Sequence, residues 1–217
     1  MLAKLSSPAA LSLSYESSSS AIGANRNRMA VQRSINQRRN GASQVYKPPQ
    51  RWSPPPSNFI KVNVDASWRS TFQQAGVGIV LRSASGDFVA GGALPVIADS
   101  PLLSEALAVL EGCKFAKQQG CAHIVIDSDC KEIINALHQP ISRGRCHVYP
   151  MLTLIKEIQS EFTECSWSWV PRAANLAADH LARIAMSRMS PSFWVNRPPS
   201  SLIGILNKDG LPCPPQY

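Results

Sequence analysis

The first patterned stretch of the chain alternates between apolar and polar residues. From Lys61 to Asp65, valines alternate with Lys61, Asn63 and Asp65. A period of two with β-branched residues indicates a strand that is buried on one face. Acids are depleted in strands, and a buried charge is costly unless a partner compensates it. Asp65 is therefore the first candidate for a metal-binding residue.

Two more strands follow this one across short turns. Residues 75–82 and 88–93 have strand patterns, and the short connections predict an antiparallel meander of three strands. Gly76 and Gly78 lie inside the second strand, where glycines permit the close approach of another backbone or a bulge. A phosphate-binding loop is the weaker interpretation of this Gly-x-Gly sequence, because no helix follows it.

The second half of the chain predicts a crossover to parallel strands. A helix is expected to begin after its N-cap, Ser100, and to end at Gly120. The continuous apolar run 123–127 is typical of a strand buried on both faces. Further elements are predicted at 129–137 (helix), 149–162 (helix), 165–170 (strand) and 173–189 (helix). The order βββαβααβα indicates an α/β fold, with a five-stranded mixed sheet in which three antiparallel strands are followed by two parallel ones, flanked by helices.

Composition separates the ends of the chain from its centre. Residues 1–57 hold eight of the 22 basic residues and one of the 14 acids, so most of the net charge of +8 belongs to this stretch. Its Ser-, Arg- and Pro-rich composition predicts a disordered leader and linker. This composition fits a transit peptide for a chloroplast or mitochondrion, and it also fits an unstructured leader without a targeting function. The folded domain is expected over residues 58–189, and residues 190–217, with six prolines, are expected to form a Pro-rich tail.

Several protein classes are excluded by what the sequence lacks. No apolar run approaches the roughly 18 residues of a membrane span, and the N-terminus has no apolar segment typical of a secretion signal. The six cysteines include no Cys-x-x-Cys pair, which argues against a zinc site and indicates a reducing compartment. These features indicate an intracellular protein, in the nucleus or cytoplasm unless the leader directs it to an organelle. We expect it to be a monomer.

Four acids stand at positions where acids are unfavourable. Asp65 lies in the first strand, Glu105 in the first turns of the long helix, Asp129 two residues after the predicted strand 123–127, and Asp179 inside the last helix. Four acids brought together would repel one another and become protonated. Divalent cations remove that conflict, and Mg²⁺ prefers carboxylate oxygens. Two such ions about 4 Å apart can hold the attacking and leaving oxygens of a phosphodiester, so the acids predict a site for two Mg²⁺ ions, for which Mn²⁺ can substitute.

These acids lie in segments that together resemble a known family. The segments are KVNVDAS (61–67), AGVGIVLRSASGDFVAGGA (75–93), SPLLSEALAVLEG (100–112), IVIDSDCKEII (124–134) and VPRAANLAADHLA (170–182). Over about residues 58–189 the chain resembles the type 1 ribonuclease H domain. The resemblance is to its reverse transcriptase-like version, found in plant proteins and in the tails of non-LTR retrotransposon polyproteins.

The resemblance implies a metal-dependent endonuclease that hydrolyses the RNA strand of RNA–DNA hybrids. It implies that the four acids are both the metal ligands and the catalytic residues: Asp65, Glu105, Asp129 and Asp179. It also implies contacts with the nucleic acid substrate from Ala66, Ser67, Ser104 and Asn175. The base Arg172 is a candidate for substrate contact through the phosphate backbone. The basic loop Arg143-Gly144-Arg145 is a further candidate for contact with the phosphate backbone.

Three departures from the family keep other functions open. Ala66 stands where the family often has Gly, the loop Val170-Pro171-Arg172 lacks the His that bacterial and retroviral members carry, and residues 129–140 hold one base, Lys131. The alternatives are a nucleic-acid-binding module that does not cut and a retroelement relic. Trp167 and Trp169 could stack on bases, but their alternation in a strand favours one core and one surface aromatic.

Overall fold

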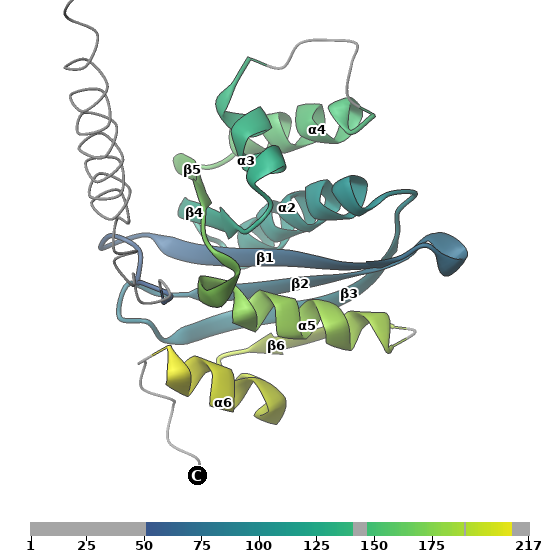
Figure 1. Cartoon of the computed structure of the whole chain (residues 1–217). Coiled ribbons are helices and arrows are strands. Elements are labelled where there is room, and N and C mark those ends of the chain that lie inside the picture. The colour runs from purple at the N-terminus through teal and green to yellow at the C-terminus, as the bar shows by residue number, and fades with distance from the viewer. Residues whose placement is uncertain (1–50, 141–146, 189, 210–217) are drawn as a thin grey trace, which may run out of the picture. The chain divides into compact units, whose positions relative to one another are not determined.

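The computed structural model describes residues 51–140, 147–188 and 190–209 (Figure 1). Residues 1–50 of the predicted disordered leader and linker (1–57) and the basic loop Arg143-Gly144-Arg145 lie outside the described residues. Trp52, within the predicted linker, is instead buried and donates a hydrogen bond to Asn63. The strands are β1 (Ile60–Arg69), β2 (Gln74–Arg82), β3 (Phe88–Ile97), β4 (His123–Ser128), β5 (Glu164–Trp169) and β6 (Ser192–Val195). The helices are α2 (Pro101–Gln118), α3 (Lys131–His138), α4 (Tyr149–Gln159), α5 (Leu176–Met186) and α6 (Ser200–Lys208). None of these helices is long and apolar enough to cross a membrane.

The strands form one mixed sheet in the order β5-β4-β1-β2-β3-β6. β1, β2, β3 and β6 pair antiparallel, whereas β4 pairs parallel with both β1 and β5. The predicted α/β class and the switch from meander to parallel strands are confirmed. The predicted count of five strands is wrong, because β6 adds a sixth at the free edge of β3.

The segment expected to be a tail supplies this sixth strand and helix α6. β6 has only four residues, too few for an alternating pattern to be recognised in sequence. Its strand conformation depends on a partner far along the chain, since Ala90–Ala93 of β3 pair with it. Leu202 and Leu206 of α6 are buried and share a cluster with Leu181 and Ala185 of α5. Residues 192–208 are thus packed against the domain.

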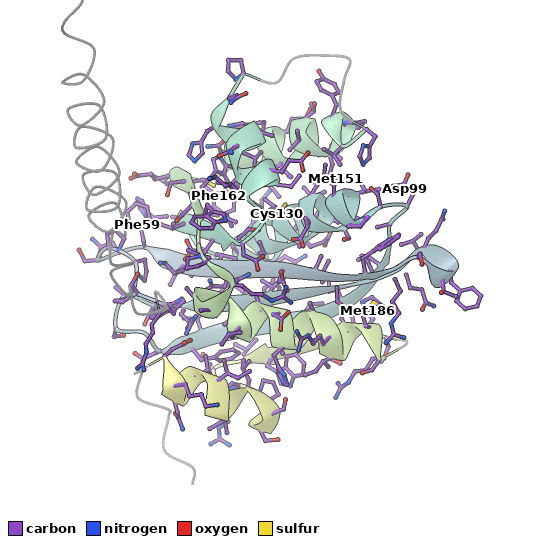
Figure 2. The ribbon with its side chains drawn as sticks, in the orientation of Figure 1. Phe59, Asp99, Cys130, Met151, Phe162 and Met186 are labelled. Carbon is purple, nitrogen blue, oxygen red and sulfur yellow. The ribbon has the colours of Figure 1, made fainter. Side chains whose placement is uncertain are left out.

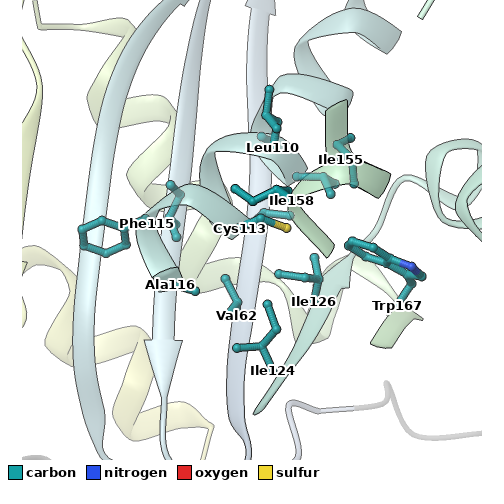
Figure 3. Packing of buried hydrophobic residues seen from close by; sticks show 14 of the residues in the cluster. Val62, Leu110, Cys113, Phe115, Ala116, Ile124, Ile126, Ile155, Ile158 and Trp167 are labelled. Atoms are coloured by element: carbon teal, nitrogen blue, oxygen red, sulfur yellow. The ribbon is translucent and has the colours of Figure 1, made fainter. Parts of the chain in front are cut away.

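Helices cover both faces of the sheet, and each face has its own apolar cluster. On one face, α2, α3 and α4 pack with the sheet around residues such as Val62, Ile126 and Ile155 (Figure 3). On the other face, α5 and α6 pack against Val80 and Phe88. The alternation of β1 follows this division: its valines face α2, so that Asn63 and Asp65 face the side of α5.

The two glycines of β2 explain how closely α5 lies on the sheet. A methyl group added to Gly78 would collide with the carbonyl oxygen of Ala178, and one added to Gly76 with that of Ala182. The predicted close approach of another backbone is therefore confirmed. This contact sets the distance between β2 and the start of α5.

Candidate active site

Three of the four predicted acids meet at one point of the sheet. Asp65, Glu105 and Asp129 each offer a carboxylate oxygen, and these three oxygens lie within 4.8 Å of one another. Asp65 is buried, whereas Glu105 and Asp129 are half-buried. The cluster of Asp65, Glu105 and Asp129 is called the acid cluster below.

Strand register brings Asp65 and Asp129 together. β1 and β4 run parallel, and their last paired residues are Asn63 and Asp127. Asp65 and Asp129 each lie two residues beyond this last pair. At this point β4 has ended at Ser128, and Cys130 leads into α3 (Figure 2). Glu105 comes from the second turn of α2, whose start is fixed by the N-cap Ser100 accepting a hydrogen bond from Leu103 N–H at 3.2 Å.

Burial and mutual repulsion make this cluster electrostatically unfavourable for three negative charges. Burial raises the pKa of Asp65 to about 9, and the neighbouring charges of Glu105, Asp129 and Asp179 add to the effect. Burial, then Asp129, raises the pKa of Glu105 to about 8. One oxygen of Glu105, Oε2, is buried and has no hydrogen-bond partner among the described residues. A divalent cation fits this donor set, because it would bind the orphaned oxygen and compensate the repulsion.

The raised pKa values predict a pH-dependent stability of the metal-free protein. In the unfolded chain, Asp65 and Glu105 release their protons near pH 4, but in the folded state they keep them up to about pH 9 and 8. The folded state binds more protons between these limits, so its free energy of unfolding falls as pH rises from about 4 to 9. Thermal unfolding in EDTA should show a lower Tm at pH 8 than at pH 5.5, and Mg²⁺ should raise the Tm more at pH 8. The difference between the wild type and Asp65→Asn isolates this effect, and a pH-independent difference would contradict it.

Asp179 lies beside the acid cluster but is held by two arginines. Arg172 Nη2 is 2.7 Å from its Oδ1, and Arg183 Nη2 is 2.9 Å from its Oδ2. Asp179 is close enough to raise the pKa of Asp65 through its charge. Arg183 is not among the residues predicted for the site, although its spacing of four residues from Asp179 on one helix is a recognised ion-pair signal.

The residues predicted to contact the substrate differ in how far they are buried. Ala66 and Ser67 follow Asp65 on β1 and are half-buried, and the side chain of Arg172 is exposed. Ser104 is buried, and its hydroxyl donates to the Pro101 carbonyl at 2.7 Å. Asn175 is fully buried, and its amide donates to the Val64 carbonyl at 2.9 Å. The side chains of Ser104 and Asn175 therefore bind the protein's own backbone and do not face solvent.

The two tryptophans of β5 differ as their alternation predicts. Trp167 is 7% exposed and belongs to the core, whereas Trp169 is 46% exposed. The Trp169 indole N–H donates to the backbone carbonyl of Asp129 at 3.0 Å, and Lys131 Nζ lies 5.7 Å from its ring. An exposed, fixed aromatic side chain thus stands directly beside the acid cluster, a position that the sequence pattern did not reveal.

The fold and the acid cluster define a ribonuclease H-like domain, and comparison with known proteins agrees. A family model described as reverse transcriptase-like matches residues 63–185, more than half of the chain. The chain therefore belongs to the reverse transcriptase-like family of ribonuclease H domains. No curated protein sequence matches it.

Several solved structures that are similar to this chain are ribonuclease H domains. RNase H1 from Halobacterium salinarum has 25% identity and a TM-score of 0.56, over 59% of this chain and 98% of that one. The N-terminal RNase H domain of a Mycobacterium tuberculosis protein has 22% identity and a TM-score of 0.54, over 59% and 94%. LC11-RNase H1, solved with an RNA/DNA hybrid, has 16% identity and a TM-score of 0.54, over 59% and 96%. The predicted ribonuclease H-like fold is confirmed.

Proposed function

We propose that this protein is a Mg²⁺-dependent endonuclease that hydrolyses the RNA strand of RNA–DNA hybrids. The observation that carries the proposal is the acid cluster, with three carboxylate oxygens within 4.8 Å of one another and a buried Glu105 oxygen without a partner. Membership of a family of ribonuclease H domains supports the same reaction. The convergence of these acids raises the electrostatic energy of the folded protein. A domain without a function for them would gain nothing in return.

In this proposal the acid cluster binds two divalent cations. Asp65, Glu105 and Asp129 would hold them. Asp179 would complete the ligand set when a cation replaces one of its arginine partners. The hard oxygen donors favour Mg²⁺, and Mn²⁺ is the expected substitute. The chemistry supplied by such cations, when bound, is a lower pKa for an attacking water and charge stabilisation for the leaving oxygen.

The remaining residues of the site would hold the nucleic acid. The side chains of Arg172 and Arg183 are 67% and 64% exposed beside the acid cluster, so their guanidinium groups are available for phosphate oxygens. Ala66 and Ser67 directly follow Asp65 and are our candidates for contact with 2′-hydroxyls, which distinguish RNA from DNA.

The experiment that tests this function compares three substrates of one sequence. The full chain is incubated with Mg²⁺ and a labelled RNA–DNA hybrid, single-stranded RNA or duplex DNA. We expect cleavage of the RNA strand of the hybrid alone, with 5′-phosphate products and complete loss of activity in EDTA. Equal cleavage of single-stranded RNA would contradict the proposal. Tight hybrid binding without cleavage in Mg²⁺ or Mn²⁺ would identify a binding module instead.

Trp169 is expected to contribute to hybrid binding. Loss of its exposed ring in Trp169→Ala should weaken hybrid affinity about 10-fold, because it removes a large aromatic surface that would pack against the nucleic acid beside the acid cluster. Trp169→Phe keeps a ring but loses the N–H donor to Asp129, so it should retain most of the affinity and lower kcat. Fluorescence anisotropy and steady-state kinetics measure the two effects.

Phe193 is the matched control for Trp169. It is 52% exposed on β6, at the edge of the sheet opposite β5. Phe193→Ala should leave hybrid affinity unchanged. Equal affinity of Trp169→Ala and the wild type would exclude Trp169 from the nucleic acid interface.

A further inference from the structure

A fully buried arginine joins the C-terminal helix to the sheet. Arg82, the last residue of β2, has no solvent exposure, and its Nη1 lies 2.7 Å from Oδ2 of Asp209, directly after α6. The Trp52 ring covers the guanidinium, with 3.6 Å between Arg82 Cζ and the ring centroid. Burial lowers the pKa of Arg82 to about 10, against the opposing effect of Asp209. The guanidinium thus stays charged at neutral pH and needs its carboxylate partner.

The same guanidinium orients a buried asparagine of β1. Arg82 Nη2 donates to Oδ1 of Asn63 at 3.2 Å, and the Trp52 indole N–H donates to the same oxygen at 2.8 Å. With Oδ1 held by two donors, the Asn63 amide nitrogen points the other way and donates to Oδ1 of Asn175 at 3.1 Å. Asn175 in turn donates to the Val64 carbonyl. Each of these buried amides is therefore fixed in one orientation.

This network ends at the two elements that carry Asp65 and Asp179. Asn63 lies two residues before Asp65 on β1. Asn175 lies at the start of α5, and its carbonyl accepts a hydrogen bond from the Asp179 N–H at 3.1 Å. Trp52 and Asp209, which lie at the other end of the network, fall outside residues 63–185 that match the family. The network is thus completed by segments on either side of the family core.

We propose that the Asp209–Arg82 ion pair is a positioning device for the active site: through Asn63 and Asn175 it fixes the start of α5 against β1, and so fixes Asp179 relative to the acid cluster. Residues 190–209 are then a functional part of the enzyme. The expected effect of this ion pair on hybrid cleavage rests on the proposed function. Its expected effect on cation binding can be measured without cleavage.

Two variants separate positioning from stability. Asp209→Asn keeps the shape of the side chain but leaves a buried charge without its partner, so the Tm should fall by about 10 °C. The double variant Arg82→Met/Asp209→Leu replaces the pair by apolar side chains, which is often neutral for stability, so its Tm should return close to that of the wild type. The double variant still lacks the donor to Asn63, and positioning should remain impaired.

The decisive measurement uses the full chain well below the Tm of every variant. Mn²⁺ binding followed by electron paramagnetic resonance should be about 5- to 10-fold weaker in the double variant than in the wild type. Hybrid cleavage should be about 10-fold slower, mainly through kcat, because the proposed nucleic acid contacts of Ala66, Ser67 and Trp169 lie on β1 and β5 and not on α5. Glu111→Gln, which removes a half-buried carboxylate paired with Lys114 on α2, is the matched control and should change neither value.

The possible results distinguish this inference from the proposed function. A double variant with wild-type Tm, wild-type Mn²⁺ affinity and wild-type cleavage would overturn the inference, since the ion pair would then serve stability alone. A wild type that binds Mn²⁺ without cleaving hybrid would refute the proposed function, whereas weaker Mn²⁺ binding in the double variant would still support positioning. A wild type that binds no Mn²⁺ would refute both.

Discussion

Replacing Asp65 by Asn is expected to lower the rate of hybrid cleavage by about 10³-fold or more and, without divalent cations, to make the protein more stable. The loss of activity follows because Asp65 is the buried member of the acid cluster and a neutral amide is a poor cation ligand. The gain in stability follows because burial and three neighbouring acids disfavour the Asp65 carboxylate, raising its pKa to about 9. Removing that group should raise the Tm at pH 8 in EDTA by about 5 °C.

Opposite changes in activity and stability distinguish a functional acid from a structural one. Cleavage is measured under single-turnover conditions, and the Tm by circular dichroism in EDTA. Asp99→Asn is the control, because Asp99 is an exposed acid just before α2 and should affect neither quantity. A lower Tm for Asp65→Asn in EDTA, or cleavage at the wild-type rate, would show that Asp65 does not have the assigned role.

Gly78→Ala is expected to destabilise the domain by about 3 kcal/mol and to reduce cleavage. The added methyl group would meet the backbone of α5 at the Ala178 carbonyl and the Ala182 amide, and backbone cannot rotate away as a side chain can. Gly78 pairs with Asp65 across the strands, and Ala178 precedes Asp179. Displacing α5 would therefore move Asp179 away from Asp65.

Gly204 provides the matched control for this substitution. It lies inside α6, and a methyl group added there meets nothing within 4 Å. Gly204→Ala should stabilise the protein by up to about 1 kcal/mol, because alanine favours helix over glycine. Urea unfolding gives both free energies. Equal stability of Gly78→Ala and the wild type would mean that α5 does not pack on β2 as closely as described.

Local pattern was sufficient to predict most of the fold and the acids of the site. The valines of β1, the apolar run of β4 and the N-cap Ser100 each depend on neighbours within a few residues, so periodicity and capping rules identify them. The glycines of β2 were interpretable for the same reason, since a glycine inside a strand indicates a close backbone. Convergence of the acids followed from their improbable positions and from resemblance to a family.

What local pattern could not predict are contacts between distant segments. β6 is too short to show a period and forms only because β3 offers a free edge. Asp209 pairs with Arg82 from 127 residues away, and nothing near either residue indicates its partner. The family resemblance implies a substrate contact for Asn175, but its amide faces β1, where Asn63 and the Val64 carbonyl bind it. The orientation of a polar side chain depends on tertiary packing, which sequence spacing does not contain.

Cation binding by the acid cluster is the most direct test of the proposed enzyme. Mn²⁺ is titrated into the full chain of the wild type, Glu105→Gln and Glu111→Gln, and the free ion is followed by electron paramagnetic resonance. Both glutamates are on α2, but only Glu105 belongs to the acid cluster. We predict binding of equal affinity in the wild type and Glu111→Gln, and binding at least about 10-fold weaker in Glu105→Gln. Equal Mn²⁺ binding by Glu105→Gln and the wild type would contradict the assignment of these acids as the metal site.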